Sequence, residues 1–298
     1  MTSVLPFSLR RNKQRYLVSC SNQGGGLFLV IIAGRDSRVI QLLNRPTTGL
    51  VISPATGKVY AAHFNGVRLF NSELRRLPDE DYVLERAYIH DVKLTSDELL
   101  VVVETARDRV AAYVARGEES WSWSPRPETK AGDRHHINSV LLSGDRMLSS
   151  MFAPEPLDKA LGERLTGAVM ETRTGQASGG RILHAGLLHP HSLIERDGAL
   201  WLCESRRNRV LRYDPPTAEP VVVAEDIPGY TRGLCITDDW VIVGQSRSDA
   251  HFIKPLLDSE PNRQDVQCGI WFFPRGKGKR FFVELPAQEV YDIVPLPS

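Results

Sequence analysis

The sequence consists of short apolar runs separated by turn residues. In HSLIERDGALWLCESRRNRVLRYDPPTAEP, residues 191–220, three such runs are divided by DG at 197–198 and DPP at 214–216, and a fourth run, VVVA, follows directly. Apolar or alternating runs bounded by Gly, Pro and Asp are typical of β-strands joined by tight turns. Four antiparallel strands within about 40 residues make one blade of a β-propeller.

The same unit recurs along the chain. ETARDRVAAY begins at Glu104 and ESRRNRVLRY begins at Glu204, so Glu, a hydroxyl residue, Arg, Asp or Asn, Arg, Val and Tyr repeat at matching offsets. Comparable units start roughly every 40 to 60 residues. The pattern therefore predicts an all-β protein, a six-bladed β-propeller. Its innermost strands are predicted to begin at Thr48, His90, Asn138, His191, Arg232 and Tyr291.

The two ends of the chain are predicted to close the ring. Apolar runs at 15–21, 27–33 and 38–43 make three strands that lack an innermost strand, and the C-terminal run EVYDIVPL, residues 289–296, has no strand after it. We expect the N-terminal strands to pair with this C-terminal strand, because closure removes exposed sheet edges.

The whole chain, residues 1–298, is predicted to form a single propeller domain, with a short flexible N-terminal segment at 1–14. Two loops, at 153–166 and 248–267, are much longer than the turns at equivalent places in other blades. Both should overhang the channel mouth at which the innermost strands begin. Long loops in compact domains are often functional.

Composition narrows the classes of partner. With 37 Lys and Arg against 36 Asp and Glu, the net charge is +1, which favours neither nucleic acid nor an anionic membrane. No run approaches 18 apolar residues, and the basic residues follow the first apolar patch, which is the wrong order for a secretory signal. We therefore expect a cytoplasmic protein without a membrane segment; its oligomeric state stays open. Four cysteines without any C-x-x-C spacing indicate buried, reduced thiols: Cys20, Cys203, Cys235 and Cys268.

Polar side chains gather at the predicted start of the innermost strands. Equivalent positions of the blades form a ring around the channel, and two residues earlier the chain has Pro46, Tyr88, His136, His189, Tyr230 and Glu289. Four of the eight histidines therefore converge at one opening. A channel lining that is only structural needs small or aliphatic side chains and a few waters.

Three interpretations of this histidine cluster compete. In the first, His90, His136 and His191 bind zinc or a similar nitrogen-preferring divalent ion, with a ligand position left open for chemistry. In the second, a metal-free polar pocket uses histidines as general acid or base. In the third, the polar groups of a water-filled channel satisfy one another. We favour the first interpretation, and nothing in the sequence suggests an organic cofactor.

Other residues complete the predicted site. Arg232 would hold a carboxylate or phosphate of a small substrate, and proton transfer is assigned to Tyr230, Tyr291 or Glu204. Additional substrate contacts are predicted for Asn138 and for His189 at the rim of the mouth.

Glu104 and Glu204 end their second strands, behind the ring. A carboxylate there can orient a ligating imidazole and so contribute to the site. Equally, each carboxylate can form an ion pair with Arg107 or Arg207.

Several motifs in fixed order resemble a bacterial family designated domain of unknown function 4915. The similarity covers most of the chain from about Tyr88 and implies a six-bladed propeller with these motifs at the channel mouth, including Arg247 as a further substrate contact. More distantly, the pattern resembles propeller lyases and lactonases that hold a metal ion in the channel. The motifs are HDV at 90, HHINSV at 135, PHS at 190, IPGYTRGL at 227, VGQSR at 243, CGIW at 268 and YDIVPLP at 291.

These features lead to one functional hypothesis and one alternative. We expect a metal-dependent lyase, isomerase or hydrolase that acts on a small polar, anionic substrate at the channel mouth. The alternative is a non-catalytic propeller that binds a ligand or a partner protein across the same mouth.

Overall fold

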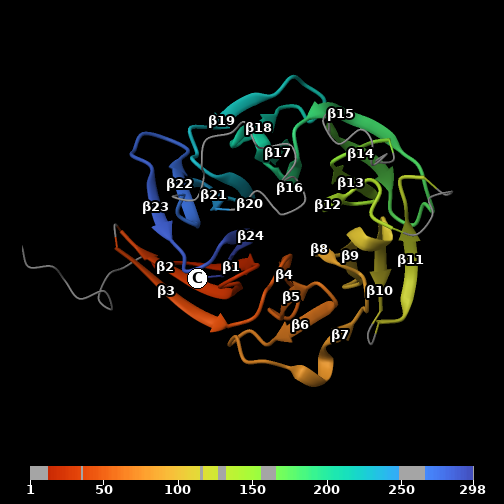
Figure 1. Ribbon diagram of the computed structural model, residues 1–298, viewed down its shortest axis with the longest axis horizontal. Helices are drawn as coiled ribbons and strands as arrows, with labels where there is room; N and C mark the ends of the chain where they lie inside the picture. The colour runs from red at the N-terminus through yellow and green to blue at the C-terminus, as the bar shows by residue number, and fades with distance from the viewer. Residues whose placement is uncertain are drawn as a thin grey trace, which may run out of the picture.

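Six blades surround a central axis. The computed structural model describes residues 13–34, 36–114, 117–126, 132–155, 166–247 and 266–297. Its strands β1–β24 form six four-stranded antiparallel sheets, which Figure 1 shows as blades arranged in a ring. The six-bladed β-propeller predicted from the sequence is therefore confirmed.

Five blades consist of consecutive strands. Blade 1 contains β4 (Leu50–Ile52), β5 (Val59–His63), β6 (Gly66–Phe70) and β7 (Tyr82–Val83). Blade 2 contains β8 (Ile89–Leu94), β9 (Leu100–Glu104), β10 (Arg109–Tyr113) and β11 (Glu119–Trp123). Blade 3 contains β12 (Ile137–Ser143), β13 (Arg146–Met151), β14 (Gly167–Arg173) and β15 (Arg181–Leu187).

Blades 4 and 5 follow the same order from the axis outward. Blade 4 contains β16 (Pro190–Arg196), β17 (Ala199–Glu204), β18 (Arg209–Tyr213) and β19 (Val221–Ala224). Blade 5 contains β20 (Tyr230–Ile236), β21 (Trp240–Ser246), β22 (Gly269–Pro274) and β23 (Phe281–Glu284). The second strands β9 and β17 are buried along their whole length, because neighbouring blades cover both faces. Their sequences are accordingly continuous apolar runs instead of alternating ones.

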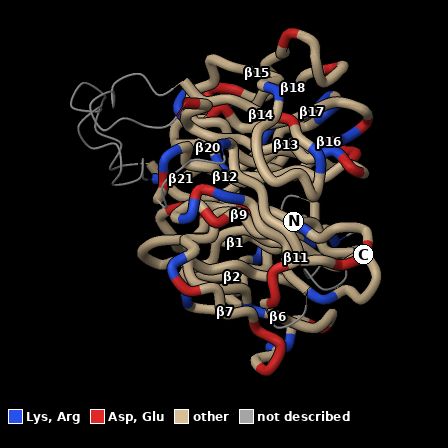
Figure 2. Tube along the Cα trace, turned by 90° about the vertical axis from the view of Figure 1, so that its right-hand side faces the viewer, with Lys and Arg blue, Asp and Glu red and all other residues tan. Residues whose placement is uncertain are grey.

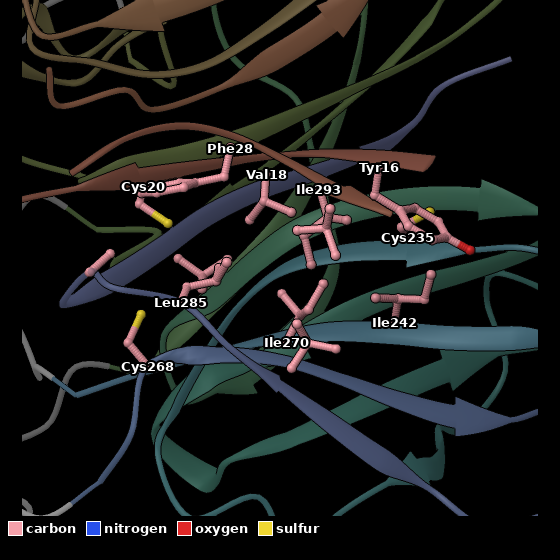
Figure 3. Close-up of a cluster of buried hydrophobic side chains, with 14 of the residues drawn as sticks. Tyr16, Val18, Cys20, Phe28, Cys235, Ile242, Cys268, Ile270, Leu285 and Ile293 are labelled. Atoms are coloured by element: carbon pink, nitrogen blue, oxygen red, sulfur yellow. The ribbon is translucent and has the colours of Figure 1, made fainter. Parts of the chain in front are cut away.

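Blade 6 joins the two ends of the chain. Its innermost strand is β24 (Glu289–Pro295), which pairs with β1 (Gln14–Ser21), and β2 (Gly26–Ala33) and β3 (Asp36–Leu43) complete the sheet. The predicted closure of the ring is confirmed. Blades 5 and 6 share an apolar cluster, shown in Figure 3, in which Tyr16, Val18 and Phe28 meet Ile242, Ile270 and Ile293.

The predicted loop insertions at 153–166 and 248–267 lie largely outside the described residues, as does most of the N-terminal segment at 1–14. In Figure 2, basic and acidic segments are interspersed along the chain. The helices within the described ranges are short 3-10 turns, and none could span a membrane.

A belt of hydrogen bonds joins neighbouring innermost strands beside the axis. The residue after a ring position accepts a bond from the backbone N–H of the next innermost strand. The four belt pairs are Asp91 Oδ2 with Val140 N at 3.0 Å, Ser139 Oγ with Leu193 N at 3.3 Å, Ser192 Oγ with Gly233 N at 2.9 Å, and Asp292 Oδ2 with Leu50 N at 3.0 Å. Side-chain acceptors thus join blades whose backbones belong to different sheets.

Glycine occupies the two remaining equivalent positions. A Cβ atom on Gly49 would lie 2.7 Å from the Cα atom of Asp91, and one on Gly233 would lie 3.2 Å from side-chain carbons of β24. Gly233 also has a φ of +76°, which L-residues with a side chain rarely adopt. At these two positions the next blade approaches too closely for a side chain.

We expect Gly49→Ala to lower the free energy of unfolding by about 1–3 kcal/mol, because the added methyl group must push blade 2 away. Urea unfolding measures the change. Gly276→Ala is the matched control, since a Cβ atom added to Gly276 would have no heavy atom within 4 Å, and it should stay within about 0.5 kcal/mol of wild type. Equal stability of the two variants would contradict the close approach of the blades.

Candidate functional site

An axial cavity of about 440 Å³ begins at the ring residues, which are the polar side chains at the start of the innermost strands. His90, Asn138, His191, Arg232 and Tyr291 line its inner end. From there the cavity follows the innermost strands towards their C-terminal ends, where its walls include Ile52, Arg196, Ile236 and Pro295. Its volume falls in the range of small-molecule sites.

β-Bulges place the ring side chains at the axis. The pairing between the first and second strands shifts register at Ile89/Val92, Ile137/Ser139, His191/Ile194, Thr231/Leu234 and, in blade 6, Ser19/Cys20. A bulge leaves its extra residue outside the ladder and redirects its side chain. The polar residue at or beside each bulge is therefore available to the channel instead of to the core between blades.

Arg232 is the most constrained residue of the ring. Its Nη1 atom lies 2.6 Å from Glu289 Oε1, and its guanidinium stands 4.3 Å from the ring centroid of Tyr291. Glu289 in turn accepts hydrogen bonds from Ser21 Oγ and from Asn22 Nδ2. The Nε atom of Arg232 is buried and has no acceptor within the described part of the chain.

His191 is held neutral and orients Arg232. The Nη2 atom of Arg232 donates to His191 Nε2 at 2.7 Å, so the ring proton resides on Nδ1, which donates to the carbonyl oxygen of His189 at 3.0 Å and lies 2.8 Å from Ser205 Oγ. Burial, and then the positive charge of Arg232, lower the pKa of His191 well below 6.5. Both of its nitrogens are therefore engaged.

His90, unlike His191, has only one of its two ring nitrogens engaged by the described residues. Its Nδ1 lies 3.2 Å from Asn138 Oδ1, and Nε2 has no hydrogen-bond partner among the described residues. Burial, followed by the charges of His136 and Arg232, lowers the pKa of His90 well below 6.5, so the imidazole is neutral. The amide nitrogen of Asn138 is buried without an acceptor in the same part of the chain. A neutral imidazole and an unsatisfied amide donor thus stand together at the inner end of the cavity.

A layer of aromatic side chains packs against the ring residues, on the side where the innermost strands begin. Phe152 is stacked between His136 and His189, with centroid distances of 4.4 and 4.1 Å, and its edge contacts His191 at 5.2 Å. Tyr230 donates to, or accepts from, His189 Nδ1 at 3.0 Å. Phe152, His136, His189 and Tyr230 do not line the cavity. The cavity therefore extends from the ring away from the mouth over which the loops were predicted to lie.

His189 belongs to this layer and not to the ring. Burial lowers its pKa to about 3, and its Nε2 is buried without a partner in the described residues. His136 and His189 have φ values of 51° and 53°, in the left-handed region. Such strained conformations persist where the surrounding structure fixes them, here through the stack on Phe152.

The three histidines predicted as metal ligands do not fit a shared ion. His191 Nε2 already accepts from a guanidinium, the Nδ1 of His136 lies 2.6 Å from Asp133 Oδ2, and the ring of Phe152 contacts both His136 and His191. Among the described residues, no group of three or more His, Cys, Asp or Glu side chains could hold a metal. Two of the three predicted ligands, His136 and His191, thus already have ring nitrogens engaged within the protein.

Glu104 and Glu204 lie away from the cavity. Each ends a second strand before a 3-10 turn, η3 (Thr105–Arg107) or η6 (Ser205–Arg207). Each accepts from two arginines: Arg107 at 3.1 Å and Arg109 at 2.7 Å in blade 2, and Arg207 at 3.0 Å and Arg209 at 2.7 Å in blade 4. The ion pairs considered as the alternative are therefore present, and the repeated motif builds a turn.

Arg247 does not line the cavity either. It is exposed, follows the end of β21, and its backbone N–H donates to Gln288 O at 2.8 Å. Its predicted contact with a substrate stays a prediction.

A second polar layer next to the ring was not singled out from the sequence. Asp91, Lys93 and Asp292 line the cavity. Lys93 Nζ lies 2.6 Å from Asp91 Oδ1, and burial raises the pKa of Asp292 to about 6 while Lys93 opposes the rise. The sequence contains a signal for this layer: at the positions directly after the six ring residues, two Asp residues stand among Ser and Gly.

These observations define a class: a six-bladed β-propeller with a polar site at the inner end of its axial cavity. The chain belongs to the family described as a domain of unknown function, DUF4915, whose model matches residues 58–298. The family resemblance seen in the sequence motifs is confirmed. A search of curated proteins finds no match.

Several solved structures share the fold. A structure of a nidogen/laminin complex matches with a TM-score of 0.67 and 10% identity, over 95% of this chain and 98% of that chain. A candidate 6-phosphogluconolactonase from Bacteroides fragilis matches with a TM-score of 0.60 and 11% identity, over 96% and 99%. Regucalcin from Agrobacterium tumefaciens, titled a calcium-binding protein, matches with a TM-score of 0.57 and 13% identity, over 83% and 76%. At these identities the similarity concerns the fold.

Zinc should not raise the thermal unfolding midpoint through the three predicted ligands, because His191 Nε2 is already an acceptor for Arg232. A ligand that binds only the native state raises the midpoint, so wild type and His191→Gln, purified without a histidine tag, should respond equally to ZnCl₂ in a melting experiment. A rise in wild type that is lost in His191→Gln would restore the metal site.

Asp292→Asn should gain stability relative to wild type as the pH rises. An unfolded aspartate has a pKa near ~3.9, so between that value and about 6 the folded protein keeps a proton that the unfolded chain has lost. The contribution of this carboxyl group to stability therefore falls with rising pH, and the neutral amide avoids the loss. Urea unfolding at about pH 4 and about pH 7 should show a relative gain of up to about 2 kcal/mol; a constant difference would contradict the raised pKa.

Proposed function

We propose that the protein is a hydrolase that cleaves an ester or lactone bond of a small polar molecule bound at the inner end of the axial cavity. One observation carries the proposal: within the described residues, a neutral imidazole with an unpaired nitrogen lines the same end of the cavity as two residues whose buried donors lack acceptors. The imidazole is that of His90, and the donors are Asn138 Nδ2 and Arg232 Nε. Buried unsatisfied groups in a cavity call for an explanation, and an oxyanion would satisfy both donors.

The proposed reaction follows from these roles. His90 Nε2 takes a proton from a water molecule, whose oxygen attacks the carbonyl carbon of the substrate. The developing oxyanion accepts from Asn138 Nδ2 and Arg232 Nε. As the tetrahedral intermediate collapses, the C–O bond to the alcohol breaks, and the alkoxide takes the proton from the imidazolium of His90. Water has been added across the bond, and the enzyme returns to its starting state.

The contacts around His90, Asn138 and Arg232 are compatible with these roles. Asn138 Oδ1 accepts the Nδ1 proton of His90, which keeps the base nitrogen directed away from Asn138. The lowered pKa of His90 keeps the imidazole unprotonated at neutral pH and makes its conjugate acid a strong proton donor. Glu289 and His191 fix the guanidinium of Arg232, so that its orientation costs little during the reaction.

The comparisons support an enzyme of this general kind, since the candidate 6-phosphogluconolactonase shares the fold over nearly its whole length. Regucalcin, a calcium-binding protein, shares the fold as well, but the proposal includes no metal because the ring histidines do not fit one. Elimination and isomerisation would need a base placed against a C–H bond of the substrate, and we choose hydrolysis because the two unsatisfied donors suit the oxyanion of a tetrahedral intermediate.

His90→Gln should lower kcat about 10²–10⁴-fold with little change in KM, because the substitution removes the base but keeps a polar group of similar length. The measurement is titration of acid released from a panel of small lactones and ethyl esters. His184→Gln is the matched control: His184 lies on β15, 2.6 Å from Pro216 O and outside the cavity, and should keep wild-type rates. Wild-type activity in His90→Gln would overturn the proposal, and ligand binding without any turnover would favour the non-catalytic module.

A further inference from the structure

Two positions of the belt carry a charge that the belt does not need. All four belt side chains perform one structural task, which is to accept a backbone N–H from the next blade. Ser139 and Ser192 perform it with a neutral hydroxyl, at 3.3 and 2.9 Å. Asp91 and Asp292 perform it with a carboxylate, at 3.0 Å each. The two serines show that joining the blades needs only a neutral acceptor. The negative charges of Asp91 and Asp292 are therefore not required for this task.

Only one of these two charges has a direct counter-ion among the described residues. Lys93 Nζ lies 2.6 Å from Asp91 Oδ1 and 3.2 Å from Val92 O. Asp292 accepts from two backbone N–H groups, those of Leu50 and Ile293, and no Lys or Arg within the described ranges forms an ion pair with it. At the ring, Arg232 is already balanced by Glu289. The layer beside the ring, as far as the structure describes it, therefore holds one carboxylate without a bound cation.

This carboxylate faces a space suited to a ligand. Asp292 lines the axial cavity together with the ring residues, and it directly follows Tyr291. Asn138 and Arg232, the residues that carry the buried unsatisfied donors, also line this cavity and are 3% and 5% exposed. Leaving a buried charge without a partner is costly, and the raised pKa of Asp292 reflects that cost. A cationic group of a ligand would remove it through a charge-assisted hydrogen bond.

We infer that the substrate carries an ammonium group that binds Asp292, while its acyl carbonyl is held at Asn138 and Arg232. The ligand class is an amino-acyl ester or an amino-substituted lactone. This inference rests on the proposed function for the identity of the bond that is broken, and goes beyond it by naming the group that selects the substrate. Asp91 is excluded from this role because Lys93 neutralises it.

Asp292→Ser is the decisive variant, because serine performs the belt task in blades 3 and 4 and so removes the charge while keeping an acceptor for Leu50 N. Binding is measured calorimetrically with β-alaninamide and its uncharged isostere butyramide. Turnover is measured with β-alanine ethyl ester and ethyl butyrate. Asp145→Ser, which removes a carboxylate that is 73% exposed and outside the cavity, is the matched control.

Wild type and Asp145→Ser should bind β-alaninamide at least about tenfold more tightly than butyramide, the preference expected of a hydrogen bond between charged groups. Asp292→Ser should bind both amides alike, and a cooperative melting transition should show that it is folded. If Asp292→Ser fails to fold, Asp292→Asn, which keeps a carbonyl acceptor, gives the same readout. Equal binding of the two amides by wild type, binding of neither at millimolar concentration, or a preference that survives both substitutions would overturn the inference.

The same experiment separates this inference from the proposed function. Hydrolysis of both esters at equal rates, together with equal binding of the amides, would support the hydrolase and overturn the ammonium site. Preferential binding of β-alaninamide that depends on Asp292, without hydrolysis of either ester, would support the ammonium site and overturn the hydrolase.

Discussion

The closed ring depends on how neighbouring innermost strands are joined near the axis. Adjacent blades of a propeller belong to different sheets, so no continuous backbone ladder connects them in the described part of the chain. The belt supplies the missing link, with side-chain acceptors at Asp91, Ser139, Ser192 and Asp292. Where the belt residue is glycine, as at Gly49, direct approach of the backbones replaces it. The spacing of the ring residues, and hence the width of the site, follows from these contacts.

The polar groups at the axis divide into a satisfied half and an unsatisfied half. Arg232 binds both Glu289 and His191 through its Nη atoms in an overall neutral network, and only its Nε has no acceptor among the described residues. Such a buried ion pair contributes little to stability unless its remaining hydrogen bonds are met, and Ser21 and Asn22 meet those of Glu289. On the other side, His90 and Asn138 each retain a nitrogen unused by the described residues. The first group of contacts fixes the guanidinium of Arg232, and chemistry can take place where the unused nitrogens of His90, Asn138 and Arg232 remain.

The repeat made most of the fold predictable. Tight turns and a recurring unit were enough to assign six blades, closure by the terminal strands and the ring positions of five innermost strands, because these depend on local pattern. Thr48, the position predicted for the remaining blade, precedes β4 and does not line the cavity. The roles of the histidines were not predictable from the sequence. Whether His191 binds a metal or Arg232 depends on the side-chain directions of two strands 41 residues apart and on β-bulges that hydrophobic periodicity does not report. The repeated Glu104 and Glu204 were misleading as site candidates, since their repetition reflects a turn that two blades share.

The ion pair at the axis also links the site to β24, the strand that closes the ring. Arg232 is on β20, whereas its counter-ion Glu289 begins β24, and the residues that anchor Glu289 lie at the end of β1 and directly after it. A nascent chain that has reached blade 5 therefore holds a guanidinium whose carboxylate has not yet been made. Only when the final segment docks against the first does that cation acquire its neutralising partner. Completion of the ring and neutralisation of Arg232 are thus a single event, and a copy that lacks β24 would leave this guanidinium without its carboxylate partner.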